Sequence, residues 1–220
     1  MLEINEQNYP LETIWEGALE SKETIRGQNL PVISLSKPLW WDDPQILGKA
    51  WVRPAGGKQY GMVRFNFSLR PEKQQEIRQV EFTVYLVQRA QCNTTFYDLF
   101  PKQINDDLSG EISASIGPEL NFAGNEVKVG GVGVKVHTKQ SFPVVVASGV
   151  GEQVAQWRFV SRPSHPLTGS QSVFAIIEYK DESLPIHASL HLDVTVASFF
   201  GPVHGILPQT ETQRLHWISG

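Results

Sequence analysis

Cysteine is almost absent from this sequence: Cys92 is the single one among 220 residues. One thiol can form no internal disulfide and cannot supply the several thiolates of a cysteine-based zinc site. The first residues are polar and acidic, without the basic flank and apolar stretch of a secretory signal. Together these features predict a chain that resides in the reducing cytoplasm.

Excess basic charge and long apolar runs are also missing. Nineteen Lys and Arg residues stand against 23 Asp and Glu residues, which gives a formal net charge of −4, and no segment is densely basic. Because nucleic-acid-binding surfaces normally carry a basic stripe, no nucleic-acid partner is predicted. No run approaches the ~18 apolar residues of a membrane-spanning helix, so no membrane span is predicted either.

The common signatures of catalysis and cofactor binding do not occur. The glycine-rich residues 130–133 lack the GxGxxG spacing, and the sequence contains no GxSxG, P-loop or HExxH pattern. Residues 105–110 have the oxygen-rich start of a calcium loop, but Ile116 stands where a bidentate acid is required. No cofactor is therefore expected, and a non-enzymatic protein is favoured over an enzyme.

Alternation of apolar and polar residues is abundant. Between residues 186 and 196 every even position is apolar and every odd position is polar. Successive side chains of a strand point to opposite faces, so this pattern predicts a strand with one buried face. Residues 173–177 are apolar throughout, which predicts a strand covered on both faces. The charged residues 180–185 between them are interpreted as the turn of a central hairpin.

Similar alternation occurs in other parts of the chain. Residues 60–69 and 77–87 both alternate and predict a second hairpin, whereas residues 11–19 are compatible with a short helix. Counting all segments gives about nine to eleven strands, with glycines and prolines marking the turns. We therefore predict an all-β fold, an antiparallel β-sandwich with short helical turns and irregular N- and C-terminal arms.

Domain boundaries are placed where the alternation starts and stops. Residues 1–30 are predicted to be an N-terminal arm, residues 31–200 the β-sandwich domain and residues 201–220 a C-terminal tail. The pattern breaks near residues 95–110, which leaves open that the sandwich consists of two halves.

A first candidate binding site consists of Trp40, Trp41, Asp42 and Asp43. Tryptophan is prominent both in sugar-stacking platforms and in the hot spots of protein interfaces. On a strand the two rings would point to opposite faces, so at least one of them is expected in the core. This stretch is the predicted contact for a small ligand, such as a carbohydrate, or for a protein.

A second candidate site is the polar face of residues 186–196, which presents His187, Ser189, His191 and Asp193. Residues two apart on a strand lie ~6.6 Å apart, so His191 and Asp193 are placed to share a metal or to act as base and orienting acid. On a straight strand His187 lies ~13 Å from His191, too far for one metal ion. The alternative interpretation is a polar surface that faces solvent.

These observations favour a non-enzymatic interaction module that acts through a protein partner or through self-assembly. The two arms without a clear pattern can become ordered when they bind. Two alternatives stay open. One is a small-ligand or carbohydrate-binding domain built on Trp40 and Trp41, and the other is a metal-dependent or hydrolytic enzyme built on His187, His191 and Asp193.

Overall fold

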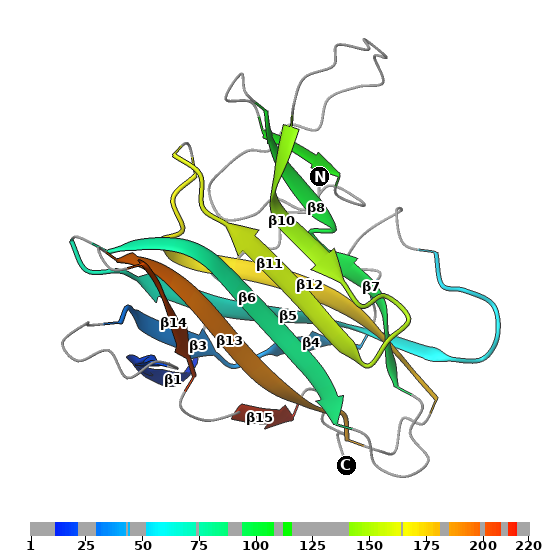
Figure 1. Cartoon of the computed structure of the whole chain (residues 1–220). Helices are drawn as coiled ribbons and strands as arrows, with labels where there is room; N and C mark the ends of the chain where they lie inside the picture. Colours follow the sequence, from blue (N-terminus) through cyan, green and yellow to red (C-terminus); the bar gives the residue numbers. More distant parts are fainter. Residues whose placement is uncertain are drawn as a thin grey trace.

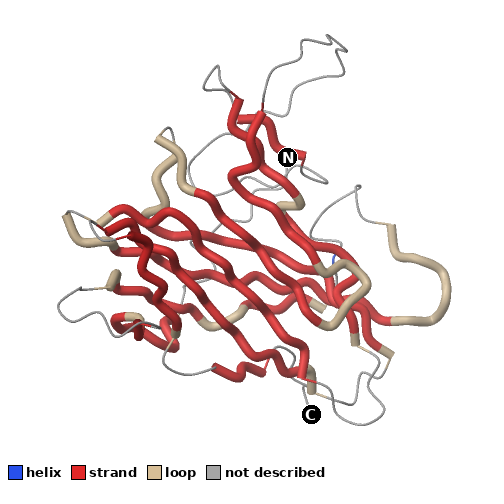
Figure 2. The backbone as a smooth tube through the Cα atoms, in the orientation of Figure 1, coloured by secondary structure: helices blue, strands red, loops and turns tan. Residues whose placement is uncertain are grey.

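The computed structural model describes a chain folded into two antiparallel sheets that pack face to face (Figure 1; Figure 2). This confirms the predicted all-β sandwich. Within the described residues there is no α-helix, and no helix there is long and apolar enough to cross a membrane. The described residues are 12–21, 30–42, 44, 52–73, 75–87, 94–107, 112–115, 141–163, 165–180, 185–198, 201–207 and 211–214.

Sheet 1 has six strands. Five follow the order β1-β3-β5-β12-β7, and β4 pairs with β5 on the same side as β3. The bounds are β1 (Thr13–Ala18), β3 (Val32–Ser36), β4 (Leu39–Trp41), β5 (Gln59–Arg70), β7 (Thr95–Phe100) and β12 (Gly169–Tyr179).

Sheet 2 has nine strands. Eight follow the order β2-β14-β13-β6-β11-β10-β8-β9, and β15 pairs with the part of β13 that β14 does not reach. The bounds are β2 (Glu20–Ser21), β6 (Glu76–Val87), β8 (Gln103–Asp107), β9 (Ile112–Ser115), β10 (Ser141–Ser148), β11 (Val154–Val160), β13 (His187–Ser198), β14 (Gly201–Ile206) and β15 (Glu211–Arg214).

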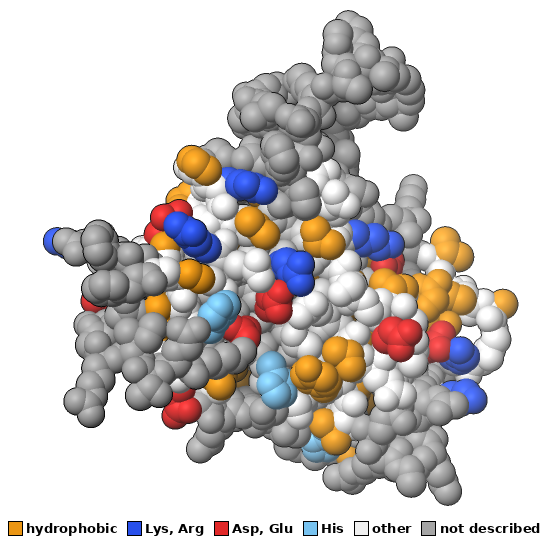
Figure 3. Space-filling model, viewed as in Figure 1, with side chains coloured by type: hydrophobic (Ala, Val, Ile, Leu, Met, Phe, Trp, Pro, Cys, Tyr) orange, Lys and Arg blue, Asp and Glu red, His pale blue; other side chains and the backbone are white. Residues whose placement is uncertain are grey.

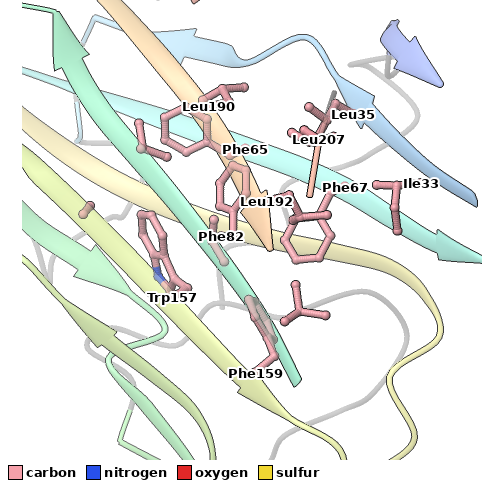
Figure 4. Packing of buried hydrophobic residues seen from close by; sticks show 14 of the residues in the cluster. Ile33, Leu35, Phe65, Phe67, Phe82, Trp157, Phe159, Leu190, Leu192 and Leu207 are labelled. Carbon is pink, nitrogen blue, oxygen red and sulfur yellow. The ribbon is translucent and has the colours of Figure 1, made fainter. Parts of the chain in front are cut away.

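The core lies between the two sheets and is rich in aromatic rings. Phe65 and Phe67 of β5 face rings of sheet 2 from β6 and β11 (Figure 4). The ring centroids of Phe67 and Phe82 are 5.2 Å apart, and those of Phe67 and Phe159 are 5.4 Å apart. Such tilted and edge-on contacts add to the stabilisation from buried apolar area.

The predicted alternation along residues 186–196 is confirmed. The even side chains of β13 are buried in the core, while the odd ones lie on the outer face of sheet 2. The inward residues are Ala188, Leu190, Leu192, Val194 and Val196.

Both predicted hairpins are wrong. β12 pairs with β5 and β7, whereas β13 pairs with β6, β14 and β15, so the two strands of the expected central hairpin lie in different sheets. β5 and β6 also belong to different sheets. Alternation specifies which side chains of a strand are buried, but the neighbour that completes the hydrogen-bond ladder is set by register over long distances. Here the chain passes from sheet 1 to sheet 2 after β5 and again after β12.

Strands occur in both segments that were expected to be irregular. Thr13–Ala18 is strand β1, so the short helix considered for residues 11–19 is wrong; its ladder with β3 supplies the backbone hydrogen bonds. Residues 12–21 then pass from sheet 1 to sheet 2, with Leu19 buried between β1 and β2. At the other end, β14 and β15 cover successive parts of one edge of β13.

Candidate functional site

Trp40 and Trp41 lie on β4 and pack on opposite sides of sheet 1, as predicted. The Trp40 ring packs against the main core, and the Trp41 ring packs against a second apolar cluster on the outer face of sheet 1. Trp40 Nε1 donates a hydrogen bond to Asp42 Oδ1 at 2.8 Å. Both rings are partly buried, so each of them contributes to packing. Asp43 lies outside the described residues.

Trp40 occupies space that a glycine leaves open. A Cβ atom added to Gly61, on the neighbouring strand β5, would lie 1.9 Å from a carbon of the Trp40 indole ring. The Trp40 ring also lies 6.0 Å from the ring of Tyr179. The tryptophan pair therefore has a defined structural role in sheet 1, and ligand contact by these residues stays a prediction.

The outer face of β13 presents His187, His191 and Asp193, as predicted. In the ladder with β6 these residues stand opposite Val87, Thr83 and Glu81 respectively. Among the described residues, no three His, Cys, Asp or Glu side chains come together in a way that could hold a metal ion. A metal site at His187, His191 and Asp193 stays a prediction.

His191 belongs to an aromatic contact. Its ring packs edge-on against Tyr85 of β6, with the ring centroids 4.9 Å apart. Partial burial lowers the pKa of the His191 imidazole, because desolvation disfavours the charged form. The ring is therefore predominantly neutral at neutral pH and adds to the apolar character of this part of the face.

Next to this contact, sheet 2 carries a hydrogen-bonded polar group centred on Glu81. Arg158 Nε donates to Glu81 Oε1 at 2.8 Å, and Gln79 Nε2 donates to the same oxygen at 3.0 Å. Gln156 Nε2 donates to Glu81 Oε2 at 3.3 Å. These contacts link β6 with β11 and bring opposite charges together in the middle of the face.

The same face exposes large apolar side chains. Tyr85, Val87 and Val154 are 41%, 44% and 39% exposed. Tyr85 and Val154 are register partners in the ladder between β6 and β11, and Val87 is the next outward residue of β6. We call Tyr85, Val87, Val154 and His191 the β6 patch. Figure 3 shows this face of the molecule, where apolar and charged side chains intermingle.

The sequence contains a signal for the β6 patch that the alternation of β6 alone does not reveal. From Val80 onward the inward residues of β6 are the even ones, and Tyr85 and Val87 occupy two of the odd, outward positions. An apolar pair at outward positions near the end of a strand indicates a surface that contacts something other than water. The partner residue Val154 could be found only once the register was known.

The chain is similar to no known family model, and no curated protein matches it. Among solved structures, it is similar to the NetB toxin of Clostridium perfringens in its membrane-inserted form, at 8% identity and a TM-score of 0.37, over 93% of this chain and 94% of that chain. It is also similar to the delta-toxin of Clostridium perfringens, at 11% identity and a TM-score of 0.36, over 90% and 87% of the two chains.

A third similar structure is ACE19, the collagen-binding subdomain of the Enterococcus faecalis surface protein ACE. The identity is 8% and the TM-score 0.32, over 74% of this chain and 99% of that chain. TM-scores this low assign neither a fold family nor a function. The class that the structure itself defines is an all-β module of two packed antiparallel sheets.

Proposed function

We propose that this chain is a non-enzymatic interaction module that binds protein through the outer face of sheet 2, and that a second copy of the chain is its partner. The observation that carries the proposal is the β6 patch. Its aromatic and aliphatic side chains are exposed on a face formed by the central strands of the sheet. Central strands are rigid, which suits a surface that binds without rearranging.

The composition of this face is that of a protein interface. Interface centres are rich in aromatic and apolar side chains, and polar side chains surround them. Here the Tyr85 ring contacts His191 of β13 on one side, and Tyr85 stands opposite its register partner Val154 of β11 on the other. The hydrogen-bonded group around Glu81 lies next to this contact and supplies polar side chains. Tyr85 is therefore placed as the anchor of the interface.

The charges on this face favour a second copy as the partner. In a two-fold symmetric pair every contact occurs twice. If one residue of the first copy touches a second residue of the other copy, the same two residues also touch with the copies exchanged. Glu81 and Arg158 are neighbours of opposite charge on the face. When the two-fold axis passes beside this pair, Arg158 of each copy faces Glu81 of the other. Such complementarity fixes orientation more than it adds affinity.

The test compares two double variants by sedimentation equilibrium over a concentration series. Tyr85→Ser/Val154→Ser removes the centre of the β6 patch. Tyr97→Ser/Val52→Ser is the matched control, because it removes a tyrosine and a valine that are also exposed but lie outside sheet 2. We expect the first pair to weaken association about tenfold or more and the control pair to leave it unchanged.

Two results would contradict the proposal. One is a wild-type chain that stays monomeric throughout the concentration series. The other is an equal loss of association in both double variants, which would place the interface elsewhere. Unfolding curves of all the proteins, recorded in parallel, separate loss of association from loss of fold.

A further inference from the structure

A buried polar group lies on the outer face of sheet 1, on the opposite side of the sandwich from the β6 patch. Arg64 and Asn66 follow each other on this face of β5, and each is only 3% exposed. Ser172 of β12 is the register partner of Asn66. The next pair of partners, Arg64 and Phe174, places the guanidinium 5.9 Å from the centre of the Phe174 ring.

Hydrogen bonds fix the orientation of the Asn66 amide. Arg64 Nε donates to Asn66 Oδ1 at 2.8 Å, and the hydroxyl of Ser172 donates to the same oxygen at 2.6 Å. The Ser172 hydroxyl also accepts a hydrogen bond from Arg64 Nη2 at 3.1 Å. Rotating the amide by half a turn would set its NH₂ group against the Nε–H of Arg64, which can only donate, so Oδ1 is the atom that faces Arg64.

The other end of this amide is a donor without an acceptor. Asn66 Nδ2 is buried and has no hydrogen-bond partner in the part of the chain that the structure describes. A buried donor that has lost water and gained no acceptor costs about 1–3 kcal/mol. Native proteins keep few such groups, and each one that persists calls for a physical explanation, such as a bound water or ion.

The hydrogen-bond ladder of sheet 1 is interrupted beside Asn66. On this edge of β5, the ladder with β3 ends at Phe67, and the ladder with β4 resumes at Arg64. Phe65 and Asn66 thus fall between the two paired stretches. The link Lys37–Pro38 between β3 and β4 passes this stretch, so β5 is not bonded there in a regular ladder.

We propose that Asn66, Arg64 and Ser172 form a binding site for a carboxylate, one oxygen of which accepts a hydrogen bond from Asn66 Nδ2. The Arg64 guanidinium supplies the positive charge nearby. A carboxylate brings a single negative charge and an acceptor oxygen for the one open donor, Asn66 Nδ2. A phosphate would bring more charge and more acceptor oxygens than this group satisfies, each at a desolvation cost.

The side-chain amide of Asn66 reports on binding directly by ¹H–¹⁵N NMR. The full-length chain is titrated with sodium acetate, and sodium chloride at the same ionic strength is the reference. We expect the Nδ2 protons of Asn66 to shift in a saturable way with acetate only. The thermal unfolding midpoint should rise with acetate in parallel, because a ligand that binds the folded state stabilises it.

Asn66→Asp replaces the Nδ2 donor by an acceptor while it keeps the oxygen that faces Arg64, so it is expected to fold and to lose the acetate effect. Asn105→Asp is the matched control. Asn105 lies on β8 and also accepts a hydrogen bond through Oδ1 from the residue two positions earlier, Gln103, at 2.7 Å. That variant should respond to acetate as the wild type does.

Three outcomes would overturn the inference. Chloride could shift the Asn66 signals as much as acetate, or Asn66→Asp could retain the full acetate effect. A crystal structure grown in acetate could also show an ordered water only at Nδ2. None of these outcomes bears on the β6 patch, which lies on the other sheet.

Discussion

Close contacts between single residues in sheet 1 make strong demands on side-chain size. Gly61 is the clearest case, because the ring of Trp40 occupies the position where a Cβ atom would lie. Replacing Gly61 by Ala should therefore displace the tryptophan and destabilise the fold by about 1–3 kcal/mol, the usual cost of overpacking. Urea-induced unfolding measures this difference.

A double-mutant cycle tests the physical reason for that cost. If the clash with Trp40 causes it, Gly61→Ala should cost much less in a Trp40→Leu background than in the wild type. Strictly additive effects of the two substitutions would show that the glycine is needed for another reason, such as backbone conformation.

Tyr60 is a residue whose ionisation reports on the outer face of sheet 1. Burial is the main cause that raises its pKa to about 12, and the hydrogen bond that its hydroxyl donates to Glu178 Oε2, at 3.0 Å, adds to the effect. Glu178→Gln should lower the pKa of Tyr60 but leave it above 10, since burial persists. Titration of phenolate absorbance, with Tyr60→Phe to assign the signal, gives both values.

The shift in the pKa of Tyr60 also predicts how stability depends on pH. Because the folded-state pKa is above the unfolded value of 10.0, the neutral tyrosine stabilises the fold fully below pH 10. That contribution is lost as the pH rises from 10 to about 12. In Tyr60→Phe this part of the alkaline loss of stability should disappear; an unchanged alkaline limb would contradict the assignment.

At the scale of elements, residues 12–21 connect the two sheets at one edge of the sandwich. β1 pairs with β3 in sheet 1, β2 pairs with β14 in sheet 2, and Leu19 lies buried between them against Gly205. Outside the ladder, Arg70 Nη2 also pairs with Glu16 Oε2 at 2.8 Å across β3. This pair is exposed, so the buried leucine is expected to contribute most of the attachment.

Leu19→Ala should destabilise the chain by about 2–5 kcal/mol, as for other buried leucines. Hydrogen exchange should show the largest loss of protection in β1, β2 and β14. The exposed neighbour Ala18, changed to Ser, is the control and should leave exchange unchanged. Loss of protection spread evenly over both sheets would show that the effect of residues 12–21 is not confined to the edge where they connect the sheets.

The pairing of elements is also where prediction from the sequence reached its limit. Period-two alternation specified the buried face of β13, because that pattern depends only on neighbours along the chain. Residues 173–177, apolar on both sides, correctly indicated a strand with two covered faces. β12 pairs with β5, and β13 with β6, across sequence separations of 100 residues or more, and no local pattern encodes these partners.

For the candidate sites too, features set within one strand could be predicted from the sequence, whereas features set by the pairing of strands could not. The opposite orientation of Trp40 and Trp41, and the outward position of His187, His191 and Asp193, were predictable because each depends on one strand. The β6 patch and the group around Asn66 each join residues of two or three strands. Asn66 and Ser172, for example, are brought together only by the register between β5 and β12.

At the scale of the whole molecule, the two outer faces of the sandwich differ in character. The outer face of sheet 1 carries a second apolar cluster and buried polar groups, with Tyr60, Met62, Phe100, Phe174 and Ile176 all almost inaccessible to solvent. The outer face of sheet 2 leaves the β6 patch open to solvent. This asymmetry is why protein contact is proposed for sheet 2 and carboxylate binding for sheet 1.

Oxidative footprinting of Tyr85 tests the assignment to sheet 2 most directly. The full chain is exposed to hydroxyl radicals when dilute and when concentrated, and oxidation of Tyr85 and Tyr97 is quantified by mass spectrometry. The account predicts that Tyr85 becomes protected as the concentration rises, while Tyr97, similarly exposed in the single chain, reacts as before. Unchanged reactivity of Tyr85 at every concentration would contradict it.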